Sequence, residues 1–386
     1  MKLTTLTLSE DALGTVARGH PWVWRDGLRG SARPGEPVML VDGKGRDVVF
    51  GLFDEGPIAV KVLGRRARPI PELLRERLHR ADVLRRRVVP GDTDCYRLLN
   101  GEGDQLPGLV VDRYADLAVV RVYSAAWEPH LDAIVDAISA LGWVNTIFRR
   151  LGVERVDGGK GGQTLRGPAA PEQVVVREHG LRFLARPYDG QKTGLFLDQR
   201  EHRRRVGELS AGRVVFNLFG YTGGFSVYAA AGGASRVLTV DIAAPALEDA
   251  KENFRLNGLA PDLHGFEAAD VFKWNPSTKS DFLICDPPSL THNKSTDGAA
   301  RSAYRDLAAR VGPMVSVDGL LATASCTARL STERWEESVR TGLRRSGVWA
   351  LLERSEAPPD HPVALEHPEG RYLKFALLRR MDTAER

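Results

Sequence analysis

The sequence contains few cysteines and no long apolar run. Its three cysteines, at positions 95, 285 and 326 of 386, are too few and too scattered for a disulfide framework or a zinc site. A reducing cytoplasm is therefore the expected location. No uncharged apolar stretch is long enough to span a membrane. The opening residues MKLTTLTLSEDALG lack the apolar core of a signal peptide. We expect neither membrane insertion nor secretion.

The glycine spacings that hold phosphate groups are also missing. Residues 213–241 predict a strand, a glycine-rich turn, a helix and a second strand, an order typical of nucleotide-binding units. However, Gly220, Gly223 and Gly224 do not fit the G-x-G-x-x-G pattern that supports a diphosphate. The stretch 188–200 places a lysine among glycines without the Walker spacing, which excludes an ATP loop there. S-adenosylmethionine has no phosphate and therefore fits the turn better than NAD. A tight turn without a ligand is the alternative.

Positive charge is concentrated in parts of the chain. The formal net charge is +4, and the pI is near 9.0. Residues 61–87 contain nine arginines, one lysine and three acids, and further arginines follow at 200 and 203–205. Such clusters favour a polyanionic partner, most simply RNA or DNA. The alternative is that residues 75–87 form an ordinary solvated helix.

The order of apolar runs and turns predicts three domains, over residues 1–70, 71–173 and 174–386. The first has short alternating apolar runs separated by turn signals, a pattern typical of a small β-barrel. These runs are 38–41, 48–53 and 58–62. Trp22 and Trp24, just before the first run, serve either as a platform for stacking bases or as core residues.

The second and third domains differ in pattern. The second begins with a basic amphipathic helix over 69–90 and predicts an α+β module, and the Gly-rich residues 156–171 predict a flexible loop. In the third, strands alternate with helices, which predicts a doubly wound α/β sheet of seven strands. No helix pattern precedes the last strand, which is therefore expected to be antiparallel. Its expected strands are 214–219, 237–241, 264–268, 282–286, 320–325, 347–352 and 372–379, and its expected helices are 224–231, 245–257, 299–311 and 332–345.

Three aspartates follow strands of the third domain, at the edge where α/β sheets bind ligands. Asp241 can accept hydrogen bonds from both hydroxyls of a ribose. Asp270 can accept one from an adenine amino group, while Val271 and Phe272 pack against the ring. Asp286 opens a rigid Asp-Pro-Pro turn and can bind a base edge or the reacting group. Each acid alone would also suit an ordinary surface cap.

Cys326 follows the next strand and faces the same edge in this prediction. A cysteine in that position is a candidate nucleophile. Methylation at C5 of a pyrimidine requires one, because C5 becomes nucleophilic only after a thiolate has added to C6. A base then removes the C5 proton and the thiolate leaves. The alternative is a packed small side chain, which is also the interpretation that we favour for Cys285.

Together these motifs resemble the RlmI-like group of class I methyltransferases, which form 5-methylcytosine in 23S ribosomal RNA. The resemblance covers the whole chain. It implies S-adenosylmethionine as donor and S-adenosylhomocysteine as product, a Rossmann-like methyltransferase domain after a PUA-like RNA-binding domain, ribosomal RNA as partner, no membrane and a homodimer. The segments that carry it are HPWVW (20–24), GQKTGLFLDQR (190–200), NLFGYTGGFSVYAAAGGASRV (217–237), VD (240–241), ENFRLNGL (252–259), DPPSL (286–290), SCT (325–327) and DHPVALEHPEGRYLKFALLR (360–379).

The resemblance also implies the site residues. Cys326 corresponds to the nucleophile, Asp286 is a second catalytic residue, and no metal is expected. Ser289 and Leu290 stand where the family commonly has Lys-Phe, so the choice of nucleotide differs if this pair touches the target base. The implied cofactor contacts are Phe216, Asn217, Phe219, Tyr221, Thr222, Gly223, Asp241, Ile242, Asp270, Val271, Asp286, Pro287 and Gln199.

Two other functions are compatible with these motifs. Methylation of a guanine N2 or another base amine would keep the cofactor and make Asp286 central. Against it, amine-methylating enzymes usually have an aromatic residue where this chain has Ser289. An RNA-binding ribosome-assembly protein with a vestigial methyltransferase domain is the third hypothesis, and the intact turn and Asp-Pro-Pro run argue against it. The missing phosphate fingerprint disfavours a nicotinamide dehydrogenase.

Overall fold

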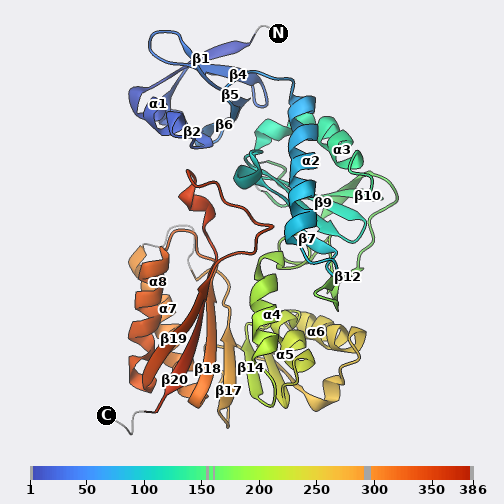
Figure 1. Cartoon of the computed structure of the whole chain (residues 1–386), viewed down its shortest axis with the longest axis vertical. Coiled ribbons are helices and arrows are strands. Elements are labelled where there is room, and N and C mark those ends of the chain that lie inside the picture. The colour runs from blue at the N-terminus through green and yellow to red at the C-terminus, as the bar shows by residue number, and fades with distance from the viewer. Residues whose placement is uncertain (1–2, 154–155, 160, 291–296, 383–386) are drawn as a thin grey trace. The chain divides into compact units, whose positions relative to one another are not determined.

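A computed structural model describes residues 3–153, 156–159, 161–290 and 297–382. The chain divides into two compact units (Figure 1). The first comprises Met1–Glu178, Ala185–Leu197 and Pro359–Gly370, and the second comprises His179–Leu184, Asp198–Pro358 and Arg371–Arg386. Within the described ranges, no helix is long and apolar enough to cross a membrane.

The N-terminal part of the first unit is a six-stranded sheet with the order β2-β6-β5-β4-β1-β3. The expected strands correspond to β4, β5 and β6, whereas β1 and helix α1 were not anticipated. Helix α1 begins after Ser9, whose hydroxyl accepts a hydrogen bond from the N–H of Ala12 at 3.3 Å. That this sheet is a PUA module stays a prediction. The bounds are β1 (Thr4–Leu8), α1 (Glu10–Ala17), β2 (Trp22–Trp24), β3 (Leu28–Arg29), β4 (Pro37–Val41), β5 (Asp47–Phe53) and β6 (Ile58–Gly64).

The rest of the first unit is an α+β module around a five-stranded sheet with the order β11-β10-β9-β8-β7. Its long helix α2 packs Leu74 and Leu78 into one hydrophobic core with Phe50 of β5 and with Trp127. The two sheets of this unit therefore share a core, and the division at residue 70 stays a prediction. The bounds are α2 (Ile70–Val88), β7 (Cys95–Asn100), β8 (Leu109–Tyr114), β9 (Leu117–Val122), α3 (Leu131–Ser139), β10 (Thr146–Arg150), β11 (Gly162–Arg166) and β12 (Val174–Glu178).

The prediction of a flexible loop over 156–171 is wrong for its central residues. Gly162–Arg166 form strand β11, which pairs antiparallel with β10. A Cβ atom at Gly162 would lie 2.2 Å from the ring of Phe148. Glycine therefore allows a close approach between strands here, and its presence does not signal flexibility.

Two of the arginines counted as a basic surface are structural. Arg85 on α2 is fully buried, and its guanidinium donates to both carboxylate oxygens of Asp104, at 2.6 and 2.7 Å. Arg77 donates to two backbone carbonyls, and burial lowers its pKa to about 10. The basic surface of this segment is therefore smaller than its composition indicates. Its exposed arginines are Arg65, Arg66, Arg68, Arg75, Arg80, Arg86 and Arg87.

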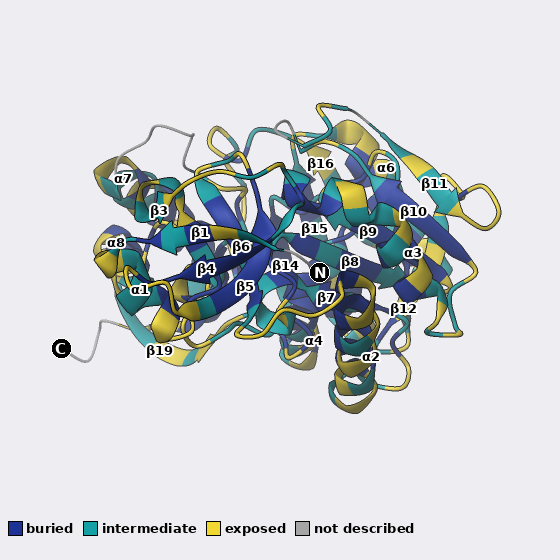
Figure 2. Cartoon of the chain, turned by 90° about the horizontal axis from the view of Figure 1, so that it is seen from above, coloured by how far each residue is buried: buried dark blue, intermediate teal, exposed yellow. Residues whose placement is uncertain are grey.

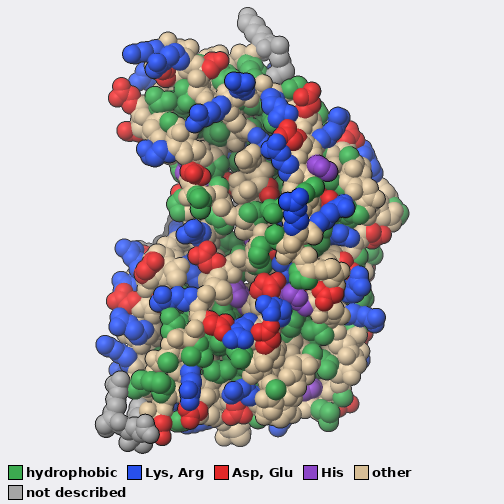
Figure 3. Space-filling view, in the orientation of Figure 1, with side chains coloured by type: hydrophobic (Ala, Val, Ile, Leu, Met, Phe, Trp, Pro, Cys, Tyr) green, Lys and Arg blue, Asp and Glu red, His purple; other side chains and the backbone are tan. Residues whose placement is uncertain are grey.

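The second arginine group also offers less basic surface than its composition indicates. Arg200 and Arg203 are buried in helix α4 (Arg200–Glu208). Arg204 forms an ion pair with Glu208, and Arg205 does so with Glu208 and with Glu353. On the face drawn in Figure 3, acidic side chains are likewise interspersed among the basic ones. Burial and ion pairing thus offset much of the charge at these positions, and their predicted contact with a polyanion stays a prediction.

The second unit is an α/β domain with a seven-stranded sheet of order β16-β15-β14-β17-β18-β20-β19. Strands β14 to β18 run parallel, and β20 is antiparallel to both of its neighbours. The seven strands and helices α5 to α8 lie close to where the sequence predicts them, which makes the fold Rossmann-like, whereas β13, outside this sheet, was not expected. The bounds are β13 (Leu181–Ala185), β14 (Val214–Leu218), α5 (Gly224–Ala231), β15 (Arg236–Asp241), α6 (Ala244–Leu256), β16 (Gly265–Ala268), β17 (Ser280–Cys285), α7 (Asp297–Val311), β18 (Val315–Ser325), α8 (Thr332–Leu343), β19 (Val348–Ser355) and β20 (Lys374–Met381).

Helices cover both faces of this sheet. Along β14, Phe216 and Leu218 belong to the core beneath α7 and α8, while Val215 belongs to the core beneath α4 and α5. This alternation is what a strand buried on both faces requires. In Figure 2, exposed residues lie on the outer faces of helices such as α7 and α8. The carboxyl ends of the parallel strands form the edge at which α/β sheets bind ligands.

Candidate active site

The glycine-rich turn between β14 and α5 is held in an unusual backbone conformation. Phe219 and Tyr221 have φ angles of 58° and 46°, and Gly223 has a φ of 74°. A Cβ atom at Gly223 would lie 2.8 Å from the Cβ of Ala250 on α6. Glycine is therefore required there for two reasons, its left-handed conformation and its close approach to the neighbouring helix. The result is a tight turn that presents backbone at the sheet edge.

Asp241, at the end of β15, ties the turn to the next helix. One carboxylate oxygen accepts a hydrogen bond from the N–H of Tyr221 at 2.8 Å, and the other accepts one from the N–H of Ala243 at 2.8 Å. The next side chain, Ile242, is 75% exposed. A partly exposed carboxylate with an uncovered apolar neighbour can bind a ribose and the base attached to it.

Asp270 lies beyond the end of β16 and forms a second acidic position near exposed apolar side chains. Its carboxylate accepts a hydrogen bond from the N–H of Phe272 at 3.0 Å. The ring of Phe272 is 48% exposed and meets the ring of Phe219 edge to face, with centroids 5.7 Å apart. Val271, by contrast, is buried. Phe219 and Phe272 therefore offer an apolar surface beside a carboxylate, as an adenine requires.

Other residues predicted to contact the cofactor are buried and stabilise the glycine-rich turn. The Asn217 amide is buried and donates to the Ser226 hydroxyl at 2.9 Å. Phe216 and Thr222 are buried as well, and the carbonyl of Thr222 accepts a hydrogen bond from the Asn253 amide at 2.8 Å. The side chains of Phe216 and Asn217 thus belong to the core, and their predicted contact with a cofactor stays a prediction.

Asp286 follows β17 and is oriented by a buried amide. It accepts a hydrogen bond from Gln199 Nε2 at 2.9 Å. Gln199 Oε1 in turn lies 2.5 Å from Nδ1 of His202. The His202 ring stacks on Phe375, and burial lowers its pKa to about 4. His202 is therefore neutral near pH 7, and Nδ1 carries the hydrogen because Oε1 only accepts. Pro287, next to Asp286, is buried.

Cys326 follows β18 and is partly exposed, whereas Cys95 and Cys285 are buried. Burial raises the pKa of Cys285, and the nearby Asp286 raises it further. An uncharged, inaccessible thiol is a poor nucleophile. The interpretation of Cys285 as a packed residue is therefore supported, and Cys326 is the cysteine that is not buried.

Two residues that the sequence reasoning missed hold the Cys326 segment. The Tyr304 hydroxyl on α7 bonds to Ser325 Oγ at 2.8 Å and to Thr327 Oγ1 at 2.9 Å. Burial raises the pKa of Tyr304 to about 12, so it is a neutral phenol. Lys374 on β20 donates from Nζ to the carbonyl of Thr327 at 2.8 Å. For Lys374 the sequence did carry a signal, because a lysine stands inside the apolar run YLKFALL.

The parallel arrangement brings these residues to one edge of the sheet. Strands β14, β15, β17 and β18 are parallel neighbours, so the turn at Gly223, Asp241, Asp286 and Cys326 all lie at their carboxyl ends. Ligands bind at this edge in α/β sheets. The stretch 188–197, in which the sequence shows no Walker spacing, belongs to the first unit.

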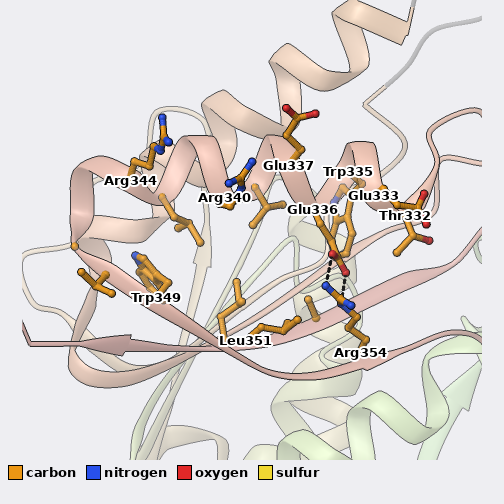
Figure 4. Close-up of a pocket in the computed structure, with 16 residues that line it drawn as sticks. Thr332, Glu333, Trp335, Glu336, Glu337, Arg340, Arg344, Trp349, Leu351 and Arg354 are labelled. Atoms are coloured by element: carbon orange, nitrogen blue, oxygen red, sulfur yellow. Dashed lines mark hydrogen bonds and ion pairs between the residues drawn. The ribbon is translucent and has the colours of Figure 1, made fainter.

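A separate apolar groove lies away from this edge. It has a volume of about 600 Å³ and lies between α8 and strands β19 and β20, with Trp335, Trp349 and Leu351 among its lining residues (Figure 4). An ion pair between Arg354 and Glu336 crosses one end of it. None of the residues predicted for the active site lines this groove.

Comparison with known proteins identifies the family. Residues 138–376 match the family described as S-adenosylmethionine-dependent methyltransferase. The chain belongs to this family. The methyltransferase is 41% identical to the ribosomal RNA large subunit methyltransferase of Deinococcus radiodurans, over 97% of both chains. It is 33% identical to the ribosomal RNA large subunit methyltransferase I of Tolumonas auensis, over 97% of this chain and 99% of that one. The resemblance drawn from the motifs is thus confirmed.

Solved structures share the fold of the methyltransferase. A candidate S-adenosylmethionine-dependent methyltransferase from Streptococcus mutans has a TM-score of 0.86 at 23% identity, covering 98% of this chain and all of that one. A second structure, solved in complex with S-adenosylhomocysteine, has a TM-score of 0.87 at 23% identity with the same coverage. Family membership makes S-adenosylmethionine the cofactor. The exposed Ile242 and Phe272 beside two carboxylates fit its adenosine, and no phosphate cradle is needed.

Proposed function

We propose that this methyltransferase transfers a methyl group from S-adenosylmethionine to C5 of a cytosine in large-subunit (23S) ribosomal RNA, with Cys326 as nucleophile. The observation that carries the proposal is the position of Cys326, partly exposed at the same sheet edge as the cofactor turn. The relatives named ribosomal RNA large subunit methyltransferase support the choice of RNA.

The chemistry assigned to Cys326 follows from the electronic structure of cytosine. The thiolate forms a bond to C6, and the electron pair of the C5–C6 double bond moves so that C5 becomes nucleophilic. S-adenosylmethionine would supply an electrophilic methyl group: as C5 bonds to it, the methyl–sulfur bond would break and S-adenosylhomocysteine would leave. A base then takes the C5 proton, the double bond re-forms and the thiolate leaves. Cys326 is thereby regenerated.

Asp286 orients the target base in this proposal. A carboxylate accepts hydrogen bonds from the amino group of cytosine, a pairing that also occurs in groove recognition. The Gln199 amide holds the carboxylate in place. The prolines that follow restrict the backbone, and Ser289 and Leu290 are the next residues that can touch the base. Asp241, Asp270, Ile242 and the turn at Gly223 are assigned to the cofactor.

The test separates cofactor binding from methyl transfer. Cys326→Ala is expected to bind S-adenosylhomocysteine as wild type does, measured by calorimetry, and to form no 5-methylcytosine, measured by mass spectrometry of nucleosides from treated rRNA. Cys285→Ser is the matched control, because this cysteine is buried, and it should keep activity. Full activity of Cys326→Ala would refute the covalent mechanism.

The first unit is proposed to hold the RNA, with its N-terminal sheet as a PUA-like module. Trp24 is 37% exposed and available for stacking, while Trp22 is half-buried and donates from its indole to Glu102 at 2.8 Å. Of the two alternatives for these tryptophans, base stacking therefore suits Trp24, and a packed role suits Trp22. Arg75 and Arg87 on α2 are exposed. Replacing both by glutamine should weaken rRNA binding and reduce its salt dependence, whereas unchanged binding would exclude this surface.

A second candidate reaction keeps the cofactor but methylates a base amine, such as guanine N2. The oriented carboxylate of Asp286 favours it, because such a group can bind the amine that reacts. In that case Cys326→Ala stays active, Asp286→Asn does not, and the product is an N-methylated nucleoside.

A non-catalytic ribosome-assembly role would instead be indicated by calorimetry that detects no binding of S-adenosylmethionine. A homodimer is also proposed from the resemblance, and sedimentation equilibrium tests it.

A further inference from the structure

Lys374 is an unusual residue for its position. It begins β20 opposite Ser325 of β18 and is only 3% exposed. Its Nζ donates to the carbonyl of Thr327 at 2.8 Å and to that of Tyr372 at 3.1 Å. Burying an ammonium group costs several kcal/mol unless an opposite charge offsets it. Some benefit must therefore offset the cost of burying the Lys374 ammonium group.

No bonded carboxylate supplies that opposite charge. Within the described residues, Lys374 forms no ion pair at 4.0 Å or less, and both of its hydrogen bonds go to neutral carbonyls. Burial lowers the pKa of Lys374, while the nearby Cys326 and, to a smaller extent, Glu356 raise it. An interaction between two groups acts equally on both, so a thiolate that favours the ammonium is itself favoured by it.

The backbone around Cys326 is held from two sides. Tyr304 bonds to the hydroxyls of Ser325 and Thr327, the residues on either side of the cysteine. Lys374 bonds to the carbonyl of Thr327. Tyr304 contributes hydrogen bonds but no charge, whereas Lys374 contributes a hydrogen bond and a positive charge. The two contributions can therefore be separated by substitution.

We propose that Lys374 is a positioning residue for the methyl transfer, whose ammonium group holds the Cys326 segment through the Thr327 carbonyl and stabilises the Cys326 thiolate. This rests on the proposed function, in which that thiolate attacks cytosine. It assigns to β20 a part in catalysis in addition to its pairing with β18 and β19. In this proposal the charge of Lys374 favours the thiolate form of the nucleophile.

The test measures the reactivity of Cys326 without RNA or cofactor. The rate of its alkylation by iodoacetamide is followed against pH in the full-length protein, with the modified peptide quantified by mass spectrometry. Lys374→Gln keeps a hydrogen-bond donor and removes the charge. We expect the midpoint of its profile to rise by about one pH unit, with up to about tenfold slower alkylation below both midpoints. Lys374→Arg keeps the charge and should restore the wild-type midpoint.

Tyr304→Phe is the matched control, because it removes hydrogen bonds to the same segment without changing charge. Its midpoint should stay at the wild-type value. The same midpoint in Lys374→Gln and wild type, or an equal rise in Tyr304→Phe, would overturn the proposal. Melting temperature and S-adenosylhomocysteine binding show whether each variant is folded. If Lys374→Gln does not fold, the wild-type profile decides, since a midpoint at or above the ordinary thiol value of about 8.5 overturns the inference.

The outcome is distinguishable from failure of the proposed function. If Cys326 is not the nucleophile, Cys326→Ala keeps its methyl-transfer activity whatever the alkylation profiles show. If Cys326 is the nucleophile but Lys374 does not stabilise it, Cys326→Ala is inactive while Lys374→Gln and wild type share one midpoint. If both proposals hold, the pH dependence of methyl transfer by Lys374→Gln shifts in the same direction as its alkylation.

Discussion

Replacing Gly223 by alanine tests how the cofactor turn is built. Two costs follow from the structure. At a φ of 74° an alanine is strained, which costs about 1–2 kcal/mol. Its Cβ would lie 2.8 Å from the Cβ of Ala250, and forcing a methyl group into a packed site costs about 1–3 kcal/mol. We therefore expect Gly223→Ala to lower the free energy of unfolding by about 2–5 kcal/mol.

Gly258 provides a matched control for the conformational part. Its φ is 67°, and a Cβ atom there would meet nothing within 4 Å. Gly258→Ala should therefore cost only the left-handed conformation, about 1–2 kcal/mol. Both variants lose the same unfolded-state entropy, so this contribution cancels in the comparison. The difference between the variants measures the contact with α6.

The assay is urea denaturation of both variants together with calorimetric titration with S-adenosylhomocysteine. Relief of the overlap requires α6 to move. Because α6 begins three residues after Asp241, this movement should displace the Asp241 carboxylate, and Gly223→Ala should therefore also weaken binding of the nucleoside. Gly258→Ala should bind like wild type. Equal stability and equal affinity of the two variants would refute the account of the turn as a close contact between backbone and helix.

Three further predictions concern buried and edge charges. Arg85→Ala leaves Asp104 without its bidentate partner and should lower the free energy of unfolding by about 3–5 kcal/mol, whereas exposed Arg87→Ala should change it by less than about 0.5 kcal/mol in the same denaturation assay. Burial lowers the pKa of His202 in the folded protein to about 4. Below about pH 6.5 the unfolded chain therefore binds a proton that the folded protein does not, and the free energy of unfolding falls by up to about 3 kcal/mol by pH 4. His202→Gln should lose correspondingly less between these pH values, and an unchanged pH dependence would contradict the burial of a neutral ring. Asp241→Ala should weaken S-adenosylhomocysteine binding by about tenfold or more in calorimetry, while Glu248→Ala, on the exposed surface of α6, should not.

The sequence was sufficient for the elements whose pattern is set locally. Helix α5 has the bounds expected from its small apolar residues, and the strand ends that carry Asp241, Asp286 and Cys326 lie where the alternation of elements predicts them. Strand β11 was missed because glycine has two opposite uses, flexibility and close approach. Only the position of the Phe148 ring distinguishes them at Gly162.

Residues at the candidate site that act through other residues were not predictable. Tyr304 lies in the middle of α7, and nothing in its local sequence indicates that its hydroxyl reaches Ser325 and Thr327. His202 lies within a run of arginines, and its neutral state follows from burial against Phe375. Such roles depend on contacts between elements distant in sequence, which periodicity and spacing do not encode.

The buried cations show why counting charge misjudges function in this chain. Arg85 has Asp104 as a bonded counter-charge, and Lys61 has Asp54 at 3.7 Å, so these charges are offset within the fold. Lys374 is as deeply buried, yet both of its hydrogen bonds go to carbonyls, and Cys326 is the titratable neighbour that most favours its charged form. A buried ammonium without a bonded carboxylate is costly for stability alone. Its retention is explained if the missing counter-charge is the thiolate that forms when the enzyme acts.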